Sequence, residues 1–154
     1  MAIRLEIPGG EPLSLEHLLL DQNGTLSNRG ELIEGVQERL LALTERLVAH
    51  ILTADTFGTL DQLTSRLGIE GHRVHTASDK LRFLERLGAQ RCVAIGNGRN
   101  DVEMLGSAAL GIAVLGPEGA STAALRAAEI ACGSVLDALD LLLDERALVA
   151  TLRG

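Results

Sequence analysis

Two short aliphatic runs of this chain end in polar residues that could handle a phosphate group or a metal ion. The Leu-Leu-Leu run at 18–20 is followed by Asp21, and Asn23 stands in the turn after it. The Ile-Leu run at 51–52 is followed by Thr53. A carboxylate can attack phosphorus or bind a cation, and a hydroxyl can donate to a phosphoryl oxygen. Taken singly, each has a simpler explanation: an acid beside an Asn-Gly turn, or a hydroxyl that caps a helix.

Two further polar groups lie in the second half of the chain. Lys80 is the only lysine among fourteen basic residues, and it stands near the start of a predicted helix. The Val-Ala-Ile-Gly run at 93–96 leads into Asn97, Asn100 and Asp101, two amides and one acid in a short loop. A solvated surface lysine and a plain glycine turn are the simpler explanations here. The four groups therefore point to shared chemistry only if the fold brings them together.

The alternation of short aliphatic runs with segments of helical period predicts repeated βα units, and hence a three-layer α/β sandwich with a mostly parallel sheet. Strands are expected near residues 18–20, 48–52, 74–76, 92–95, 111–114 and 130–131. Helices are expected near residues 34–47, 60–67, 79–87, 102–107, 120–127 and 136–143. In such sheets ligands bind beyond the carboxyl ends of the strands, so the four polar groups should meet at one edge.

Length and composition indicate one domain that spans residues 1–154. Hydrophobic residues make up 46% of the chain but aromatic residues only 1%, so the core must be aliphatic. Residues 2–15, interrupted by Pro8 and Pro12, predict an N-terminal hairpin at the edge of the sheet. The α/β core itself is expected to cover residues 18–143.

In their order and context, the four groups resemble the motif set of the haloacid dehalogenase (HAD) superfamily, from about residue 18 to residue 143. The similarity is closest to the phosphorylation domain of P-type ATPases. Thr-Ala-Asp at 53–55 looks like their Thr-Gly-Asp, and the stretch 79–114 looks like their hinge segment. A compact branch, often labelled soluble P-type ATPase, has this arrangement without a transport domain. The resemblance implies a Rossmann-like sandwich with no cap domain, because the segments between the motifs hold only one helix and one strand each.

By this resemblance, Asp21 is the nucleophile of a Mg²⁺-dependent phosphohydrolase or phosphotransferase, and it forms an aspartyl-phosphate. Thr53, with Ala54 beside it, binds the phosphoryl oxygens. Lys80 neutralises charge between the nucleophile and the phosphate, and Asn100 could also reach phosphate or metal. A carboxylate attacks a phosphate dianion only when cations and donors offset their repulsion, so this set of groups is chemically coherent.

The implied magnesium shell contains Asp21, Asp101, the side-chain oxygen of Asn97 and the backbone carbonyl of Asn23. Two positions depart from the superfamily's pattern, which usually has Asp at 23, where it protonates the leaving group, and Asp at 97, where it binds the metal. An amide does no acid–base work and binds magnesium more weakly. Slow turnover is therefore expected. The alternative is a catalytically impaired HAD-fold module that binds a phosphorylated ligand or a partner protein.

Composition also excludes several classes of partner. The net charge is −7 and the basic residues are scattered, which argues against nucleic acid. No apolar stretch approaches the roughly 18 residues of a membrane span, and no secretory signal is evident, so a cytoplasmic protein is expected.

A site without a cap suits a phosphorylated small molecule or a phosphoprotein, or a homo-oligomer whose neighbouring subunit acts as a lid. His72 and His75 would point to opposite faces of a strand, so no zinc pair is expected there.

Restoring both acids, Asn23→Asp together with Asn97→Asp, should raise Mg²⁺-dependent phosphatase activity. The gain should approach about 10²–10⁴-fold if the acid at 23 restores acid–base catalysis. The measurement is the initial rate of phosphate release from an alkyl monoester by the double variant and by the wild type. Equal rates would contradict the roles assigned to these two positions.

Overall fold

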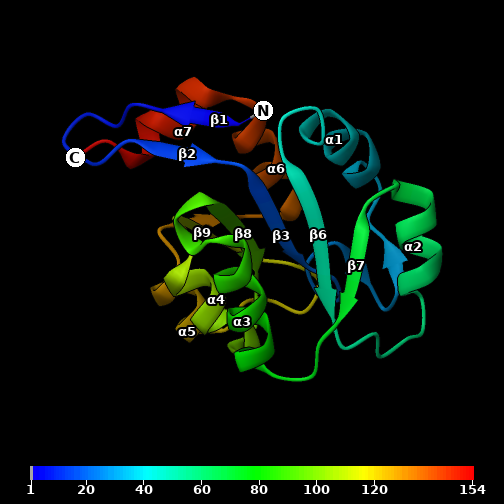
Figure 1. Cartoon of the computed structure of the whole chain (residues 1–154). Coiled ribbons are helices and arrows are strands. Elements are labelled where there is room, and N and C mark those ends of the chain that lie inside the picture. Colours follow the sequence, from blue (N-terminus) through cyan, green and yellow to red (C-terminus); the bar gives the residue numbers. More distant parts are fainter. Residues whose placement is uncertain (1) are drawn as a thin grey trace.

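The computed structural model, which describes residues 2–154, is built on a six-stranded sheet (Figure 1). All neighbouring strands of this sheet pair in parallel. The chain runs from β3 outward to β6 and β7, then returns beside β3 and continues outward through β8, β9 and β10. A topological switch point therefore lies between β3 and β8. In spatial order the strands are β10 (Ile130–Cys132), β9 (Leu110–Val114), β8 (Cys92–Gly96), β3 (His17–Asp21), β6 (Val48–Thr53) and β7 (Glu70–Arg73).

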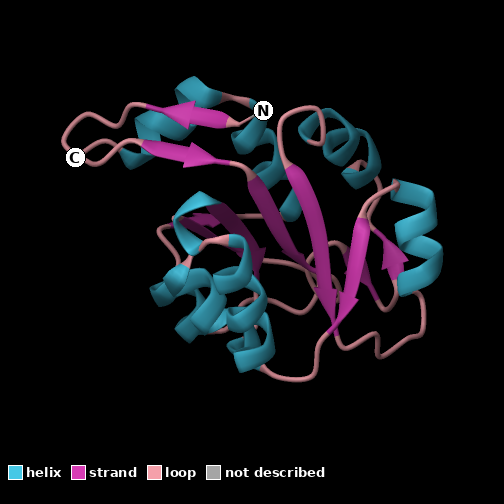
Figure 2. Ribbon diagram, in the orientation of Figure 1, coloured by secondary structure: helices cyan, strands magenta, loops and turns pink. Residues whose placement is uncertain are grey.

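Helices cover both faces of the sheet, as Figure 2 shows in cyan. One face packs against α1 (Val36–Leu43), α2 (Leu60–Leu67), α6 (Val135–Leu143) and α7 (Glu145–Leu152). The other face packs against α3 (Ala77–Leu87), α4 (Val102–Ser107) and α5 (Thr122–Ala127). Two short 3₁₀ turns, η1 (Ala89–Arg91) and η2 (Arg99–Asp101), precede β8 and α4.

The aliphatic runs become central strands because both of their faces are buried. In β3, Leu18 and Leu20 join the core on the α1–α2–α6 face, whereas Leu19 joins the core on the α3–α4–α5 face. All three side chains are fully buried. Alternate side chains of a strand point to opposite faces, so an unbroken aliphatic run is what a strand between two helical layers requires.

The N-terminal hairpin forms, with β1 (Ile3–Leu5) antiparallel to β2 (Leu13–Leu15). The expected position at the sheet edge needs correction, because the hairpin is a separate two-stranded sheet and β2 leads through Glu16 into the central strand β3. Helix α7, which the sequence analysis did not anticipate, packs against β1. Leu148 of α7 is fully buried, so the hairpin and α7 extend the core on that face.

The strand expected at residues 74–76 is also displaced. β7 covers Glu70–Arg73, and residues 74–76 connect it to α3. β7 is an edge strand whose four residues are exposed or only half-buried, so it has no aliphatic run to mark it. Gly71 has no Cβ, and one placed there would lie 2.5 Å from the Thr64 methyl group. The glycine therefore allows α2 to pack closely against β7.

The fold class is confirmed as a three-layer α/β sandwich with a parallel sheet and no cap domain. Between β3 and β6 the chain forms only α1 and a small hairpin of β4 (Ser27–Asn28) with β5 (Glu31–Leu32). Between β6 and α3 it forms only α2 and β7. Within residues 2–154, no helix has the length and apolar character needed to cross a membrane.

Candidate active site

The predicted polar residues meet at the carboxyl end of the sheet, around a cavity of about 490 Å³. Asp21 ends β3, Thr53 ends the neighbouring strand β6, and Asn97 directly follows β8 on the other side of β3. The cavity therefore lies at the switch point, where ligands of open α/β sheets bind. It is lined by Asp21, Asn23, Thr53, Ala54, Thr56, Lys80, Asn97, Gly98, Asn100, Glu118, Ala120 and Ser121.

Lys80 is buried between two carboxylates. Its Nζ donates to Asp21 Oδ1 at 2.9 Å and to Asp101 Oδ1 at 2.7 Å. Lys80 is only 2% exposed, and it is the largest of the fully buried residues among residues 2–154. An ammonium can remain charged at such burial only because both carboxylates contact it directly.

The first turn of α3 positions this lysine. Thr76 caps the helix by accepting the backbone N–H of Asp79, and the Asp79 carboxylate accepts the backbone N–H of Thr76 in return. The backbone N–H of His75, together with the Arg82 guanidinium, lowers the pKa of Asp79 to about 2. The Asp79 carboxylate therefore stays ionised at any physiological pH, and its bonds hold the turn that carries Lys80.

Asp101 lies behind the ammonium and is fully buried. Its Oδ2 accepts the backbone N–H groups of Asn97 and Gly98, each at 3.0 Å, while Oδ1 accepts from Lys80. It is not among the residues that line the cavity. Its part in a magnesium shell stays a prediction, whereas its contacts with the turn and with the ammonium are direct.

Side-chain oxygens converge on the hydroxyl of Thr25. This hydroxyl lies 3.0 Å from Asp21 Oδ2 and 3.3 Å from Asn97 Oδ1, and its one proton can serve only one of them at a time. Asn97 Nδ2 donates to the Gly119 carbonyl at 3.0 Å, which leaves the amide oxygen facing the Thr25 hydroxyl. The Asn23 side-chain oxygen is buried without a hydrogen-bond partner in the described chain. Oxygen acceptors thus outnumber donors here.

Thr53 keeps its hydroxyl proton available, because its Oγ1 accepts the backbone N–H of Asp55 at 2.9 Å. Asp55 adopts a left-handed conformation with φ 58°. Its carboxylate accepts from the backbone N–H of Leu60 and from Arg73 Nε, at 3.0 and 3.1 Å. These bonds hold the turn in which Ala54 lines the cavity.

The charges at this site do not balance. Burial, followed by repulsion from Asp101, raises the pKa of Asp21 to about 6, although Lys80 and Thr25 pull it down. Burial disfavours the Lys80 ammonium, but the attraction of the two carboxylates outweighs this and raises its pKa. With both acids ionised, one excess negative charge remains, and a bound cation would relieve it.

Glu118, which no sequence motif marked, lines the cavity from the loop between β9 and α5. A Cβ at Gly24 would lie 2.1 Å from Glu118 Oε2, and a Cβ at Gly116 would lie 2.0 Å from the Gly24 carbonyl oxygen. The loop is therefore pressed onto the turn after Asp21. Gly24 and Gly116 permit this contact because they have no Cβ, but no pattern in the sequence links residue 118 to residue 24.

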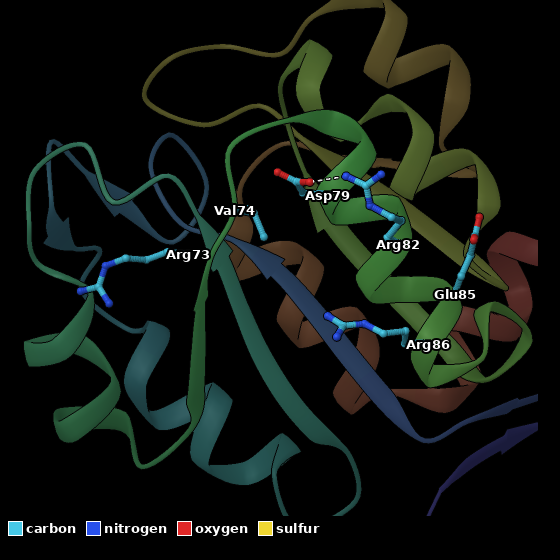
Figure 3. Close-up of a pocket in the computed structure, with 6 residues that line it drawn as sticks. All are labelled: Arg73, Val74, Asp79, Arg82, Glu85 and Arg86. Carbon is cyan, nitrogen blue, oxygen red and sulfur yellow. Dashed lines mark hydrogen bonds and ion pairs between the residues drawn. The ribbon is translucent and has the colours of Figure 1, made fainter.

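A separate hollow of about 700 Å³ does not gather the predicted residues. In Figure 3, Arg73 points away from the side chains of α3, and Arg82 turns to Asp79. Arg73 is paired with Asp55 at 3.1 Å, so its charge is already engaged elsewhere. The hollow is lined by Arg73, Val74, Asp79, Arg82, Glu85 and Arg86. The cavity at Asp21 is the stronger candidate.

A family model described as haloacid dehalogenase-like hydrolase matches residues 6–109 of the chain. The chain belongs to the haloacid dehalogenase-like hydrolases. Two uncharacterised proteins of Methanocaldococcus jannaschii are also similar. MJ0073 is 45% identical over 78 residues, 48% of this chain and 84% of MJ0073. MJ0072 is 54% identical over 39 residues, 25% of this chain and 89% of MJ0072.

Solved HAD structures share the fold at low sequence identity. A 3-deoxy-D-manno-octulosonate 8-phosphate phosphatase of Moraxella catarrhalis, in complex with magnesium, phosphate and KDO, has a TM-score of 0.70 and 20% identity, over 90% of this chain and 94% of that one. A cobalt-bound deoxy-D-mannose-octulosonate 8-phosphate phosphatase from Haemophilus influenzae has a TM-score of 0.71 and 13% identity. The match covers 91% of this chain and 94% of that one. A phosphoserine phosphatase has a TM-score of 0.69 and 15% identity, over 84% and 98%. At these identities the likeness establishes the fold of the HAD chain.

Asp21→Asn should raise the melting temperature of the metal-free protein above pH 6. The folded pKa of about 6 exceeds the unfolded value of 3.8, so above pH 6 the ionised carboxylate costs folding free energy, on the order of 2–3 kcal/mol. This cost fades as the pH falls through 6 toward 4, because the folded state then takes up the proton. The expected gain is on the order of 5 °C at pH 7.5 and is smaller at pH 4.5.

Thermal unfolding followed by circular dichroism in EDTA measures both values. Glu11→Gln is the matched control, because it removes an exposed carboxylate in the β1–β2 turn and should leave the melting temperature almost unchanged. A lower melting temperature for Asp21→Asn than for the wild type at pH 7.5 would show that the charge at 21 is stabilising.

Proposed function

We propose that this HAD chain is a Mg²⁺-dependent phosphohydrolase or phosphotransferase whose nucleophile is Asp21. The single observation that carries the proposal is the buried Lys80 ammonium, 2.9 Å from Asp21 and 2.7 Å from Asp101, at a cavity that Thr53 also lines. Buried charges with a strongly shifted pKa beside a cavity are typical of reactive sites. A phosphoryl group brings the negative oxygens that this ammonium and this hydroxyl can bind.

In the first step, an Asp21 oxygen forms a bond to phosphorus while the bond from phosphorus to the leaving oxygen breaks, and the electron pair departs with the leaving group. Lys80 offsets the charge of the nucleophile and of the phosphoryl group. Thr53 donates its proton to a phosphoryl oxygen, with Ala54 and Asn100 beside it. Asp21 attacks only when ionised, which its pKa of about 6 permits at neutral pH. Attack of water or of another acceptor on phosphorus then releases Asp21.

Magnesium fits the residues present. The buried, unpartnered side-chain oxygen of Asn23, the side-chain oxygen of Asn97 and the Asp21 carboxylate are all hard oxygen ligands, which Mg²⁺ prefers. In this proposal the side-chain oxygen of Asn23 takes the place of the backbone carbonyl that the resemblance implied. These residues would hold the ion, with Asp101 behind them. When bound, Mg²⁺ supplies positive charge that draws in the phosphoryl oxygens and weakens their repulsion from the nucleophile.

Asn23 limits the leaving groups. An amide cannot protonate an alkoxide, so an alkyl phosphate ester would depart poorly. Acyl phosphates, aryl phosphates and nucleotide anhydrides need little protonation of the leaving oxygen. We therefore assign the chain to such substrates, as the resemblance to P-type ATPases also suggests.

The substrate is a phosphorylated small molecule or a phosphoprotein that reaches the cavity directly, because no inserted domain covers it. The similar structures named as phosphatases of 3-deoxy-D-manno-octulosonate 8-phosphate and of phosphoserine favour a small molecule. A second copy of the chain could supply the missing lid.

A second candidate follows from the amides at 23 and 97. With neither acid in place, the same cavity would serve as a binding module for a phosphorylated ligand or partner protein. Retention of beryllium fluoride by the wild type without any turnover would favour this candidate.

With millimolar Mg²⁺, the wild type should release phosphate from acetyl phosphate at least about 10²-fold faster than from glycerol 3-phosphate, because only the alkyl leaving group needs the missing acid. Asp21→Asn should abolish both activities, and Glu11→Gln should retain them. Phosphate release is measured against the uncatalysed rate. Faster turnover of the alkyl ester would refute the assigned leaving groups, and full activity of Asp21→Asn would refute the nucleophile.

A further inference from the structure

Three histidines lie side by side on the sheet face that α3 covers, away from the cavity at Asp21. His17, His50 and His72 come from the adjacent strands β3, β6 and β7. The ring centroids of His17 and His50 are 5.4 Å apart, and those of His50 and His72 are 5.7 Å apart. Phe83 of α3 packs on the second pair, at 5.3 Å from His50 and 4.4 Å from His72. None of these residues lines the cavity at Asp21.

Two nitrogens of this cluster are buried without a hydrogen-bond partner in residues 2–154, His50 Nδ1 and His72 Nε2. His50 is 4% exposed, so water does not readily satisfy its nitrogen. The carboxylate of Glu70 lies near both, with Oε2 3.6 Å from His50 Nδ1 and 3.5 Å from His72 Nε2. Unpartnered buried polar atoms are rare in folded proteins, and here two of them face one carboxylate.

We propose that His50, Glu70 and His72 bind one divalent transition-metal ion of the zinc class. Two imidazole nitrogens with one carboxylate oxygen are a common zinc ligand set, which leaves a fourth position for water. Metal–ligand bonds of about 2.1 Å in a tetrahedron place ligand atoms about 3.4 Å apart, close to the two distances from Glu70. The three ligand atoms lie within 4.8 Å of one another, so a small closing movement of side chains completes the geometry.

The surroundings of His50 suit a metal ligand. Its Nε2 lies 3.3 Å from His17 Nδ1, and donation from Nε2–H to His17 would leave the Nδ1 lone pair directed at Glu70 and His72. A metal-bound histidine commonly donates its other N–H in this way, which fixes the ring. Burial, and then the neighbouring His17, lower the pKa of His50 to about 4, so its imidazole is neutral at neutral pH.

The site is accessible and would join elements of the fold. The Glu70 side chain is 70% exposed and that of His72 is 32% exposed, so an ion can enter from the edge of the sheet. Arg91, whose charge acts on the neighbouring His17, is paired with Glu16 at 3.1 Å, which reduces its repulsion of a metal. A bound ion would tie the edge strand β7 to β6, and it would stand independently of the proposed phosphoryl chemistry.

The test is isothermal titration calorimetry of the chelator-treated protein with Zn²⁺, in millimolar Mg²⁺ so that oxygen-rich sites are occupied. One equivalent should bind. His72→Ala removes one ligand and should weaken binding at least about tenfold. Glu70→Gln should weaken binding less, because the glutamine side chain keeps a neutral oxygen in place of the carboxylate. His75→Ala is the matched control, since His75 is an exposed histidine outside the cluster, and it should bind like the wild type.

Two further readouts identify the ligands. Co²⁺ should give the strong visible absorption of a four-coordinate site in the wild type and in His75→Ala but not in His72→Ala. Zn²⁺ at about 100 times its Kd should raise the melting temperature of the wild type by about 5–10 °C, and this shift should be lost in His72→Ala. Absence of Zn²⁺ binding by the wild type, or wild-type affinity in both His72→Ala and Glu70→Gln, would overturn the proposal.

Discussion

The buried contact of Lys80 with Asp21 and Asp101 is the constraint on which the rest of the site depends. These residues come from α3, β3 and η2, so the contact fixes how the helix lies against the end of the sheet. Removing the lysine would leave two buried carboxylates facing each other without a cation, a situation that costs several kcal/mol. Removing the charge at 21 instead leaves one ammonium and one carboxylate, which balance. The ammonium is therefore the one charge that both carboxylates require.

The two acids differ in how far the rest of the protein supports their charges. Asp101 is fully buried and receives two backbone N–H groups in addition to the ammonium, so its charge is well supported. Asp21 receives one hydroxyl and the shared ammonium, and burial raises its pKa to about 6. A carboxylate that the protein alone stabilises poorly is one that a cation or an electrophile can stabilise further. The same imbalance is what the cation in the proposed function would relieve.

The sequence predicted those parts of the molecule that local pattern controls. Asp21, Thr53 and Asn97 each follow a buried aliphatic strand, and parallel strands bring their carboxyl ends together, so their convergence could be foreseen. β7 was placed wrongly because an edge strand of Glu-Gly-His-Arg carries no apolar run. Glu118 was missed because a loop's contact with a distant turn depends on packing alone. That His72 lies beside His50 was not foreseen for a similar reason, since strand pairing, not sequence spacing, brings the two histidines together.

In the scheme proposed here, strand β6 borders two metal sites of different chemistry. Its last residue, Thr53, lines the cavity at the end of the sheet, where Asp21, Asn23 and Asn97 offer oxygen atoms as metal ligands. Its third residue, His50, faces α3 from the middle of the strand and offers a nitrogen instead. Mg²⁺ binds oxygen ligands and holds its waters, whereas zinc-class ions prefer imidazole. In the scheme proposed here the imidazole ligands disfavour Mg²⁺ at the histidine cluster, whereas the greater abundance of Mg²⁺ keeps zinc-class ions from occupying the oxygen site.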